Sequence, residues 1–225
     1  MPQDYVGYFL NSSLAQGEPS ALLTLLLLFM ARFLPIIAQS PFLGARVLPH
    51  PVKVTFSLTM FAIFLPKLLQ VTTTPLTFSI FSVMLLVKEV FIGTCLGFIM
   101  GMPFIIVQNA GILIDHQRGG ASLMVNDPTI QNQSSPIGTL YNMMLIVTFF
   151  SIDGPFFVLD AILDSFQIVP PDQYLNPLFF APHSYLKEKL FKCLQVFAVM
   201  ALQLSAPSLI AMLMTDTFLG VINRL

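Results

Sequence analysis

Five long apolar segments restrict the possible folds of this chain more than any other feature of its sequence. Each is long enough to cross a membrane as a helix and too long for a typical strand. The segments are separated by polar or proline-containing connections and lie at about 21–43, 54–71, 76–114, 137–161 and 190–214. A backbone at membrane depth must satisfy its own hydrogen bonds, and the strict alternation of barrel strands is absent. We therefore predict an all-α membrane protein that forms one multi-helix domain over 1–225.

The composition also indicates a membrane protein. Only 9% of the 225 residues are charged and 56% are hydrophobic, whereas about 25% of the residues in an average soluble domain are charged. The net charge is −1 and the basic residues form no dense run, so we predict membrane lipid and no nucleic acid among the partners. No Lys or Arg precedes Arg32, and we expect membrane insertion to use internal segments instead of a cleaved signal peptide.

Each apolar segment contains a proline. The five prolines are Pro35, Pro66, Pro103, Pro155 and Pro207. A proline inside a helix removes one backbone hydrogen bond and bends the helix. The sequence therefore predicts kinked helices instead of straight membrane-spanning rods.

Charged residues also interrupt the apolar segments, although lipid tolerates them poorly. They are Arg32, Lys67, Lys88, Glu89, Asp153 and Asp160. Lys88 and Glu89 are neighbours that point about 100° apart on a helix, so we expect each to need a partner elsewhere instead of pairing with the other. We predict that Lys88, Glu89 and Asp153 are buried charges, and that Asp153 and Asp160 face either protein or water instead of lipid. Arg32 and Lys67 are equally compatible with side chains that extend to the lipid headgroups.

The loop charges contradict a simple alternating topology. With five crossings, one side would carry Arg46, Lys53 and Arg118, and the opposite side would carry Lys187, Lys189 and Lys192. This division disagrees with the excess of positive charge expected on the cytoplasmic side. We therefore expect either a different number of crossings or helices that partly leave the membrane.

Three glycines recur at every fourth position of the third segment. Gly93, Gly97 and Gly101 lie nearly in line on one helix face, just before Pro103. Small residues at this spacing let another helix approach closely. We predict a helix-packing face formed by these four residues, and the packing helix belongs either to the same chain or to a neighbouring subunit.

The sequence contains no convincing catalytic or metal-binding cluster. Asp115 and His116 are adjacent and do not aim at one point, while His50 and His183 stand alone in different loops. No GxxxxGK[ST] phosphate-binding loop is present. We therefore predict that the chain is not an enzyme and needs no metal or other cofactor.

A polar stretch, QNAGILIDHQRGGASLMVNDP at 108–128, follows the long apolar run of the third segment. Its glycines, Gly111, Gly119 and Gly120, permit sharp turns or close backbone approach, and the residue before Pro128 avoids helical geometry. We predict a helix end, a tight loop and a short hydrophobic return. An ordinary solvated loop is the alternative, although the apolar residues ASLMV at 121–125 argue against it.

Two ordered motifs give the chain a family resemblance. GFIMGMPFIIVQNAGILIDHQRGGASLMVNDP and, later, LSAPSLIAMLMTDTFLGVINR at 204–224 resemble the FliR/SctT family of bacterial type III secretion export-apparatus proteins. The IDHQRGG portion is more similar to the injectisome (virulence) branch than to the flagellar branch. The resemblance implies a multi-pass subunit of an export gate in the bacterial inner membrane, through which unfolded secreted proteins pass.

In that family the gate is a hetero-oligomer of helical hairpins, and part of the assembly stands above the membrane plane. The resemblance therefore implies FliP/SctR-type and FliQ/SctS-type subunits as partners, together with an FlhB/SctU-type switch protein and unfolded secretion substrates. Family members continue past the INR motif. The resemblance thus implies either that the sequence is truncated after Leu225 or that the family's C-terminal region is missing.

The resemblance also implies a role for the polar loop, which would plug the channel until substrate arrives. The residues assigned to this plug are Asp115, Gln117, Arg118, Gly119, Gly120, Ala121, Ser122 and Asp127. Small residues would fit the pore, and Asp115 and Arg118 would hold the plug through charged hydrogen bonds.

A secondary transporter of a small solute or ion is the rival hypothesis. Broken helices and membrane-depth charges would then form a binding site around Lys88, Glu89 and Asp153. The absence of a matching pair of inverted repeats argues against it. An intramembrane enzyme is a weaker third possibility, because the sequence brings no catalytic groups together.

Overall fold

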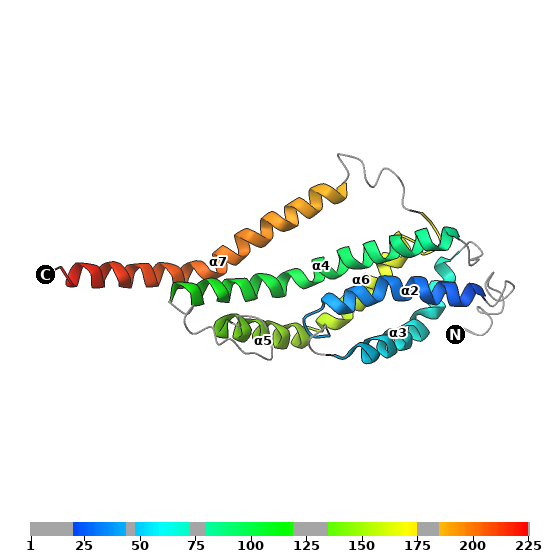
Figure 1. Ribbon diagram of the computed structural model, residues 1–225, viewed down its shortest axis with the longest axis horizontal. Helices are drawn as coiled ribbons and strands as arrows, with labels where there is room; N and C mark the ends of the chain where they lie inside the picture. Colours follow the sequence, from blue (N-terminus) through cyan, green and yellow to red (C-terminus); the bar gives the residue numbers. More distant parts are fainter. Residues whose placement is uncertain (1–19, 44–47, 73–79, 119–134, 175–184, 225) are drawn as a thin grey trace. The chain divides into compact units, whose positions relative to one another are not determined.

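The computed structural model describes residues 20–43, 48–72, 80–118, 135–174 and 185–224. These residues form helices joined by turns, and no strand occurs among them, which confirms the predicted all-α class. The helices are α2 (Ser20–Gln39), α3 (His50–Val71), α4 (Ile80–Gln117), α5 (Pro136–Ser151), α6 (Gly154–Ile168) and α7 (Tyr185–Ile222) (Figure 1).

Each predicted apolar segment corresponds to helical structure, but the fourth is broken into α5 and α6. Asp153 lies at the break with φ of 59°, a left-handed conformation that no helix interior contains. The Pro155 ring follows at the second position of α6, where a missing N–H removes no helical hydrogen bond. The expectation of an internal proline is therefore wrong for Pro155, which lies at the start of a new helix.

The other four prolines lie inside helices, as predicted. Pro35 is in α2, Pro66 in α3, Pro103 in α4 and Pro207 in α7. The bend in α7 is visible part-way along its length (Figure 1). A helix that contains proline loses a backbone bond there, which accounts for a change of direction.

Four of the described helices are long and apolar enough to cross a membrane: α2, α3, most of α4 and most of α7. The count becomes five when α5 and α6 are taken together as one broken span. This agrees with the five apolar segments of the sequence. The number of membrane crossings therefore depends on whether α5 and α6 together form one broken span.

The chain divides into two compact units. The first unit comprises Met1–Gly101 and Gly154–Ala181, and the second unit comprises Met102–Asp153 and Pro182–Leu225. The boundary falls within α4, which contributes to both. The prediction of one domain over 1–225 therefore stays a prediction.

The first unit has an aromatic core between α2, α3 and α6. Phe29 lies at its centre, with ring centroids 5.1 Å from Phe33, 5.6 Å from Phe61 and 5.6 Å from Phe166. Residues of α2 at helical spacing, including Leu25, Phe29 and Phe33, are buried together. Each such aromatic pair adds about 0.5–1.5 kcal/mol beyond the burial of its surface.

The second unit buries fewer large side chains. Met102, Phe104 and Ile114 of α4 are buried, and the Phe104 ring packs edge-on against Phe149 of α5 at 5.6 Å. Contacts between residue 104 and residue 149, and between 111 and 138, show that α5 runs back along the C-terminal half of α4. This antiparallel pair holds the two ends of the polar loop.

Candidate functional site

The first candidate site is a buried charge cluster formed by Arg32, Lys88 and Glu89 in the first unit. Arg32 and Glu89 are both 0% exposed. The Arg32 guanidinium contacts both oxygens of the Glu89 carboxylate, through Nε to Oε2 and through Nη2 to Oε1 at 2.9 Å. This two-pronged geometry is the strongest form of a charge-assisted hydrogen bond. It joins α2 to α4.

Lys88 completes the charge cluster. Its Nζ lies 2.8 Å from Oε1 of Glu89, so the prediction that these neighbours do not pair is wrong. The Cα–Cβ bonds of the two residues point apart on the helix, but the flexible four-carbon side chain of Lys88 lets its ammonium group reach the Glu89 carboxylate. Both residues also have the distant partners that we predicted. Nζ of Lys88 donates to the carbonyl oxygens of Pro170 at 2.8 Å and Gln173 at 2.7 Å, and Glu89 accepts from Arg32.

Arg32 makes further contacts with the end of α6. Its guanidinium donates to Oγ of Ser165 at 3.2 Å and to the carbonyl oxygen of Val169 at 2.8 Å, and it lies 4.0 Å from the centroid of the Phe166 ring. The Arg32 side chain therefore does not extend to the headgroups. The sequence signal for a pair between Arg32 and Glu89 was the presence of opposite charges in two apolar segments.

The transporter hypothesis finds little support in this arrangement. The donors and acceptors of Lys88 and Glu89 are bonded to protein groups, which leaves no evident position for a solute. Both side chains are buried as predicted, but Asp153 is exposed and belongs to the second unit. Asp153 occupies the exposed turn between α5 and α6 in the single chain, so its burial in an assembly stays a prediction.

The glycine face of α4 packs against α2 of the same chain. A Cβ atom at Gly93 would lie 2.2 Å from the carbonyl oxygen of Arg32, and one at Gly97 would lie 3.1 Å from Cα of Ile36. Gly101 has more space, with its nearest neighbour at 3.6 Å. The intramolecular alternative is thus confirmed for Gly93 and Gly97. Pro103 is exposed, so its predicted packing contact is not with the described part of this chain.

A second close contact between glycines was missed. A Cβ atom at Gly111 would lie 2.4 Å from Cα of Gly138, so the backbones of α4 and α5 nearly touch. Of the two roles predicted for Gly111, a sharp turn or a close backbone approach, the structure shows the close approach, because α4 continues as a helix to Gln117. The two glycines are 27 positions apart, and only a prediction that their segments pair would have related them.

The second candidate site is the loop base, which we define as Asp115, Ser135, Ile137 and Gly138. One carboxylate oxygen of Asp115 accepts hydrogen bonds from the hydroxyl of Ser135 and from the backbone N–H of Ile137 at 3.1 Å. The hydroxyl oxygen of Ser135 accepts from the N–H of Gly138 at 2.9 Å and so caps α5. The loop base joins the end of α4 to the start of α5.

The structure describes only some of the predicted plug residues. Asp115 is buried in the last turns of α4, where Ser135 and Ile137 donate hydrogen bonds to it. Gln117 ends the helix and Arg118 follows it, and both are exposed. The remaining plug residues, Gly119, Gly120, Ala121, Ser122 and Asp127, lie outside the described residues. The role of Asp115 and Arg118 in holding the plug through charged hydrogen bonds stays a prediction.

A polar groove of about 980 Å³ lies between α3 and α6 in the first unit. Its polar lining residues are Lys67, Gln70, Asp160, Asp164 and Gln167. The sequence indicated Lys67 and Asp160 as membrane-depth charges, but not that they face one groove. Lys67, Asp160 and Asp164 are exposed in the single chain. Charged residues within membrane-spanning segments face protein or water instead of lipid, so we expect either another protein or water to occupy the groove.

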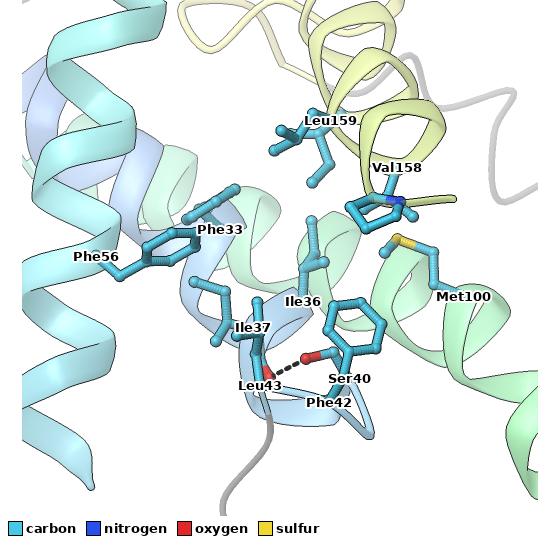
Figure 2. Close-up of a pocket in the computed structure, with 12 residues that line it drawn as sticks. Phe33, Ile36, Ile37, Ser40, Phe42, Leu43, Phe56, Met100, Val158 and Leu159 are labelled. Carbon is cyan, nitrogen blue, oxygen red and sulfur yellow. Dashed lines mark hydrogen bonds between the residues drawn. The ribbon is translucent and has the colours of Figure 1, made fainter. Parts of the chain in front are cut away.

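An apolar cavity of about 80 Å³ lies at the other side of the first unit's core. Figure 2 shows Phe33, Ile36 and Phe56 around it, with Met100 from α4 and Val158 from α6. The Ser40 hydroxyl donates its proton to the carbonyl oxygen of Ile37 at 2.8 Å, so it has no donor left for a ligand. The cavity is a gap in helix packing without chemistry of its own. Among the described residues, no group of three or more His, Cys, Asp or Glu converges on a metal position.

Comparison with known proteins decides the family. The sequence model of bacterial export proteins, family 1, matches residues 23–225. The chain belongs to this family. The match spans the glycine helix, the polar loop and α7, and it confirms the resemblance found in the sequence.

Relatives of two kinds are similar to the chain. The flagellar biosynthetic protein FliR of Pectobacterium carotovorum is 28% identical over 193 residues, which are 86% of this chain and 71% of that protein. Yop proteins translocation protein T of Yersinia pestis is 32% identical over 145 residues, or 64% of this chain and 54% of that protein. Secretion system apparatus protein SsaT of Salmonella typhimurium is 33% identical over 140 residues, or 62% and 52%.

The chain thus spans about half the length of the latter two relatives. Flagellar proteins and secretion proteins both occur among the matches, so the injectisome branch stays a prediction. Family membership and the four or five apolar helices make the chain a multi-pass protein of the bacterial inner membrane. None of the three relatives has a name that states an enzymatic activity.

Proposed function

We propose that this chain is a subunit of the type III secretion export gate. It forms part of the channel for unfolded secreted proteins, and the loop between α4 and α5 helps to close the pore. The observation that carries the proposal is the loop base within a chain of this family. Asp115 holds the two ends of the connection within hydrogen-bond distance, so the connection begins and ends at one closed base.

A gate of this kind works through the displacement of a segment, without bond chemistry. Gln117 and Arg118 are exposed where the connection begins, which leaves their polar groups available to the lumen. Gly119, Gly120, Ala121 and Ser122 follow them in the sequence. Small residues suit a plug that an unfolded polypeptide must displace, because they make few contacts that substrate would have to replace.

The partners we infer are FliP/SctR-type and FliQ/SctS-type subunits and an FlhB/SctU-type switch protein. The single chain exposes many large apolar side chains, for example Met143 and Val147 on α5 and Leu213 and Phe218 on α7. Such surfaces need lipid or another protein. A relative named as a secretion system apparatus protein supports partner subunits.

Deletion of residues 118–122 tests the gate. We expect complexes with this deletion to assemble normally and to let ions or small molecules leak through the membrane, because the tip of the plug is missing. Permeability of membrane vesicles that contain purified complexes measures the effect. A variant in which the same five positions carry a Gly/Ser segment of equal length separates loop length from side-chain chemistry. Unchanged permeability in correctly assembled deletion complexes would remove the gate assignment.

Purification tests the subunit role. We expect the chain to co-purify with two other helical membrane proteins of the export apparatus. The proposal fails if the chain alone, reconstituted in lipid, transports a small solute and forms no complex with those proteins.

A further inference from the structure

We propose that Asp115 is a positioning residue that keeps the loop base closed whether the gate is open or shut. This inference depends on the proposed function, because it concerns how the gate loop moves. The end of α4 and the start of α5 would stay joined at Asp115 and Ser135 in both states of the gate. Asp115 would thus belong to the fixed frame of the gate and not to the plug itself.

The burial of Asp115 is the first support. Its side chain is 7% exposed, and one carboxylate oxygen accepts from both the Ser135 hydroxyl and the Ile137 N–H. A buried carboxylate that loses its hydrogen bonds is strongly unfavourable. Separation of α4 from α5 at this point would leave that carboxylate without these partners, so a closed base is the preferred state.

Complete hydrogen bonding of the first turn of α5 is the second support. Pro136 has no N–H, the N–H of Ile137 bonds to Asp115, and the N–H of Gly138 bonds to Ser135. The N–H of Thr139 bonds to the carbonyl oxygen of Ser135 at 2.9 Å. The donors that a helix start normally leaves unpaired are therefore satisfied, and α4 supplies one of the acceptors. A carboxylate at this position also interacts favourably with the helix dipole.

The glycine contact beside the loop base is the third support. Gly111 lies one helical turn before Asp115 on α4 and meets the backbone of Gly138. A Cβ atom at Gly138 would in turn lie 2.9 Å from the carbonyl oxygen of Gln108. Backbones this close exclude larger side chains, so the glycine contact and the hydrogen bonds fix the same crossing.

Hydrogen exchange of the assembled export complex tests the inference. The N–H groups of Ile137 and Gly138 are followed in the closed complex and in a complex arrested on a secreted protein fused to a domain too stable to unfold. We expect equal protection of these two groups in both complexes. Loss of their protection in the arrested wild-type complex would overturn the proposal, because the base would then open with the gate.

Variants of the loop base provide the second arm. Asp115→Ala should increase exchange at Ile137 by about tenfold, because one acceptor is lost. Asp115→Asn retains an oxygen acceptor and should restore most of the protection, whereas a merely space-filling role would give the same exchange in both variants. If Asp115→Ala fails to fold, Asp115→Asn and Ser135→Ala provide the comparison. A negative leak assay on the 118–122 deletion would remove the gate and leave these exchange results intact, so the two failures are distinguishable.

Discussion

The two units of the chain differ in how they are held together. The first unit buries an aromatic core and the charge cluster, and half of the most apolar window of α2 lies inside the structure. The second unit contains the loop base and α7, of which only 11% of the corresponding window is buried. The mean hydropathy is 2.3 for the α2 window and 2.0 for the α7 window. Apolar character alone therefore does not determine which helix is buried within the chain.

This difference indicates that the two units depend on different sources of stability. A unit with its own core keeps one arrangement when it is alone. A unit that leaves its apolar side chains uncovered takes its final stability from lipid or partner subunits. The loop that we propose as a gate is attached to the second kind of unit, where its displacement would disturb little of the buried core.

Removal of Glu89 should have the largest effect. Glu89→Ala leaves the Arg32 and Lys88 cations buried without their carboxylate, which costs about 3–5 kcal/mol in comparable buried pairs. We expect loss of folded protein, measured as thermal unfolding of the purified chain. Asp164→Ala is the matched control, because Asp164 is an exposed acid in the same unit. Equal stability of the two variants would contradict the role of the charge cluster.

A methyl group on the glycine face should have the next largest effect. The Cβ atom of Gly93→Ala would meet the Arg32 carbonyl oxygen at 2.2 Å, and overpacking of this kind costs about 1–3 kcal/mol. Gly220→Ala in α7 is the control, since nothing lies within 4 Å of its added carbon. That control should stabilise the helix by up to about 1 kcal/mol. Melting temperatures that shift in the same direction would show that α2 does not approach α4 as closely as described.

A polar substitution on the exposed faces should change stability least and assembly most selectively. Val147 in the second unit and Val87 in the first unit are 66% and 65% exposed. Changing either to Asn should alter the stability of the single chain by less than about 0.5 kcal/mol. We expect Val147→Asn to reduce co-purification with partner subunits more than Val87→Asn does. An equal loss for both would mean that partners cover the two units alike.

The sequence predicted the helices well because apolar length is a local property. It predicted less about contacts, which depend on residues far apart in the chain. Arg32 and Glu89 lie in α2 and α4, with α3 between them in the sequence. Their opposite charges make them possible partners, but nothing near either residue specifies the other. Local reasoning ended the third segment at 114, whereas α4 continues to Gln117, because the polar residues from Asp115 onward concealed the last residues of the helix. The left-handed Asp153 ended the fourth segment early, and a backbone conformation of that kind has no strict sequence signal.

Hydrogen exchange of the chain alone and within its assembled complex, in the same detergent, tests the central claim most directly. The claim is that contacts within the chain stabilise the first unit and partner contacts stabilise the second. The account predicts that amides of α2 and α6 have the same protection in both states, because their contacts are within the chain. Amides of α5 and α7 should gain at least about tenfold protection on assembly, since partner contacts suppress local opening. Equal protection of α7 in the two states, or a gain in α2 as large as in α7, would contradict the account.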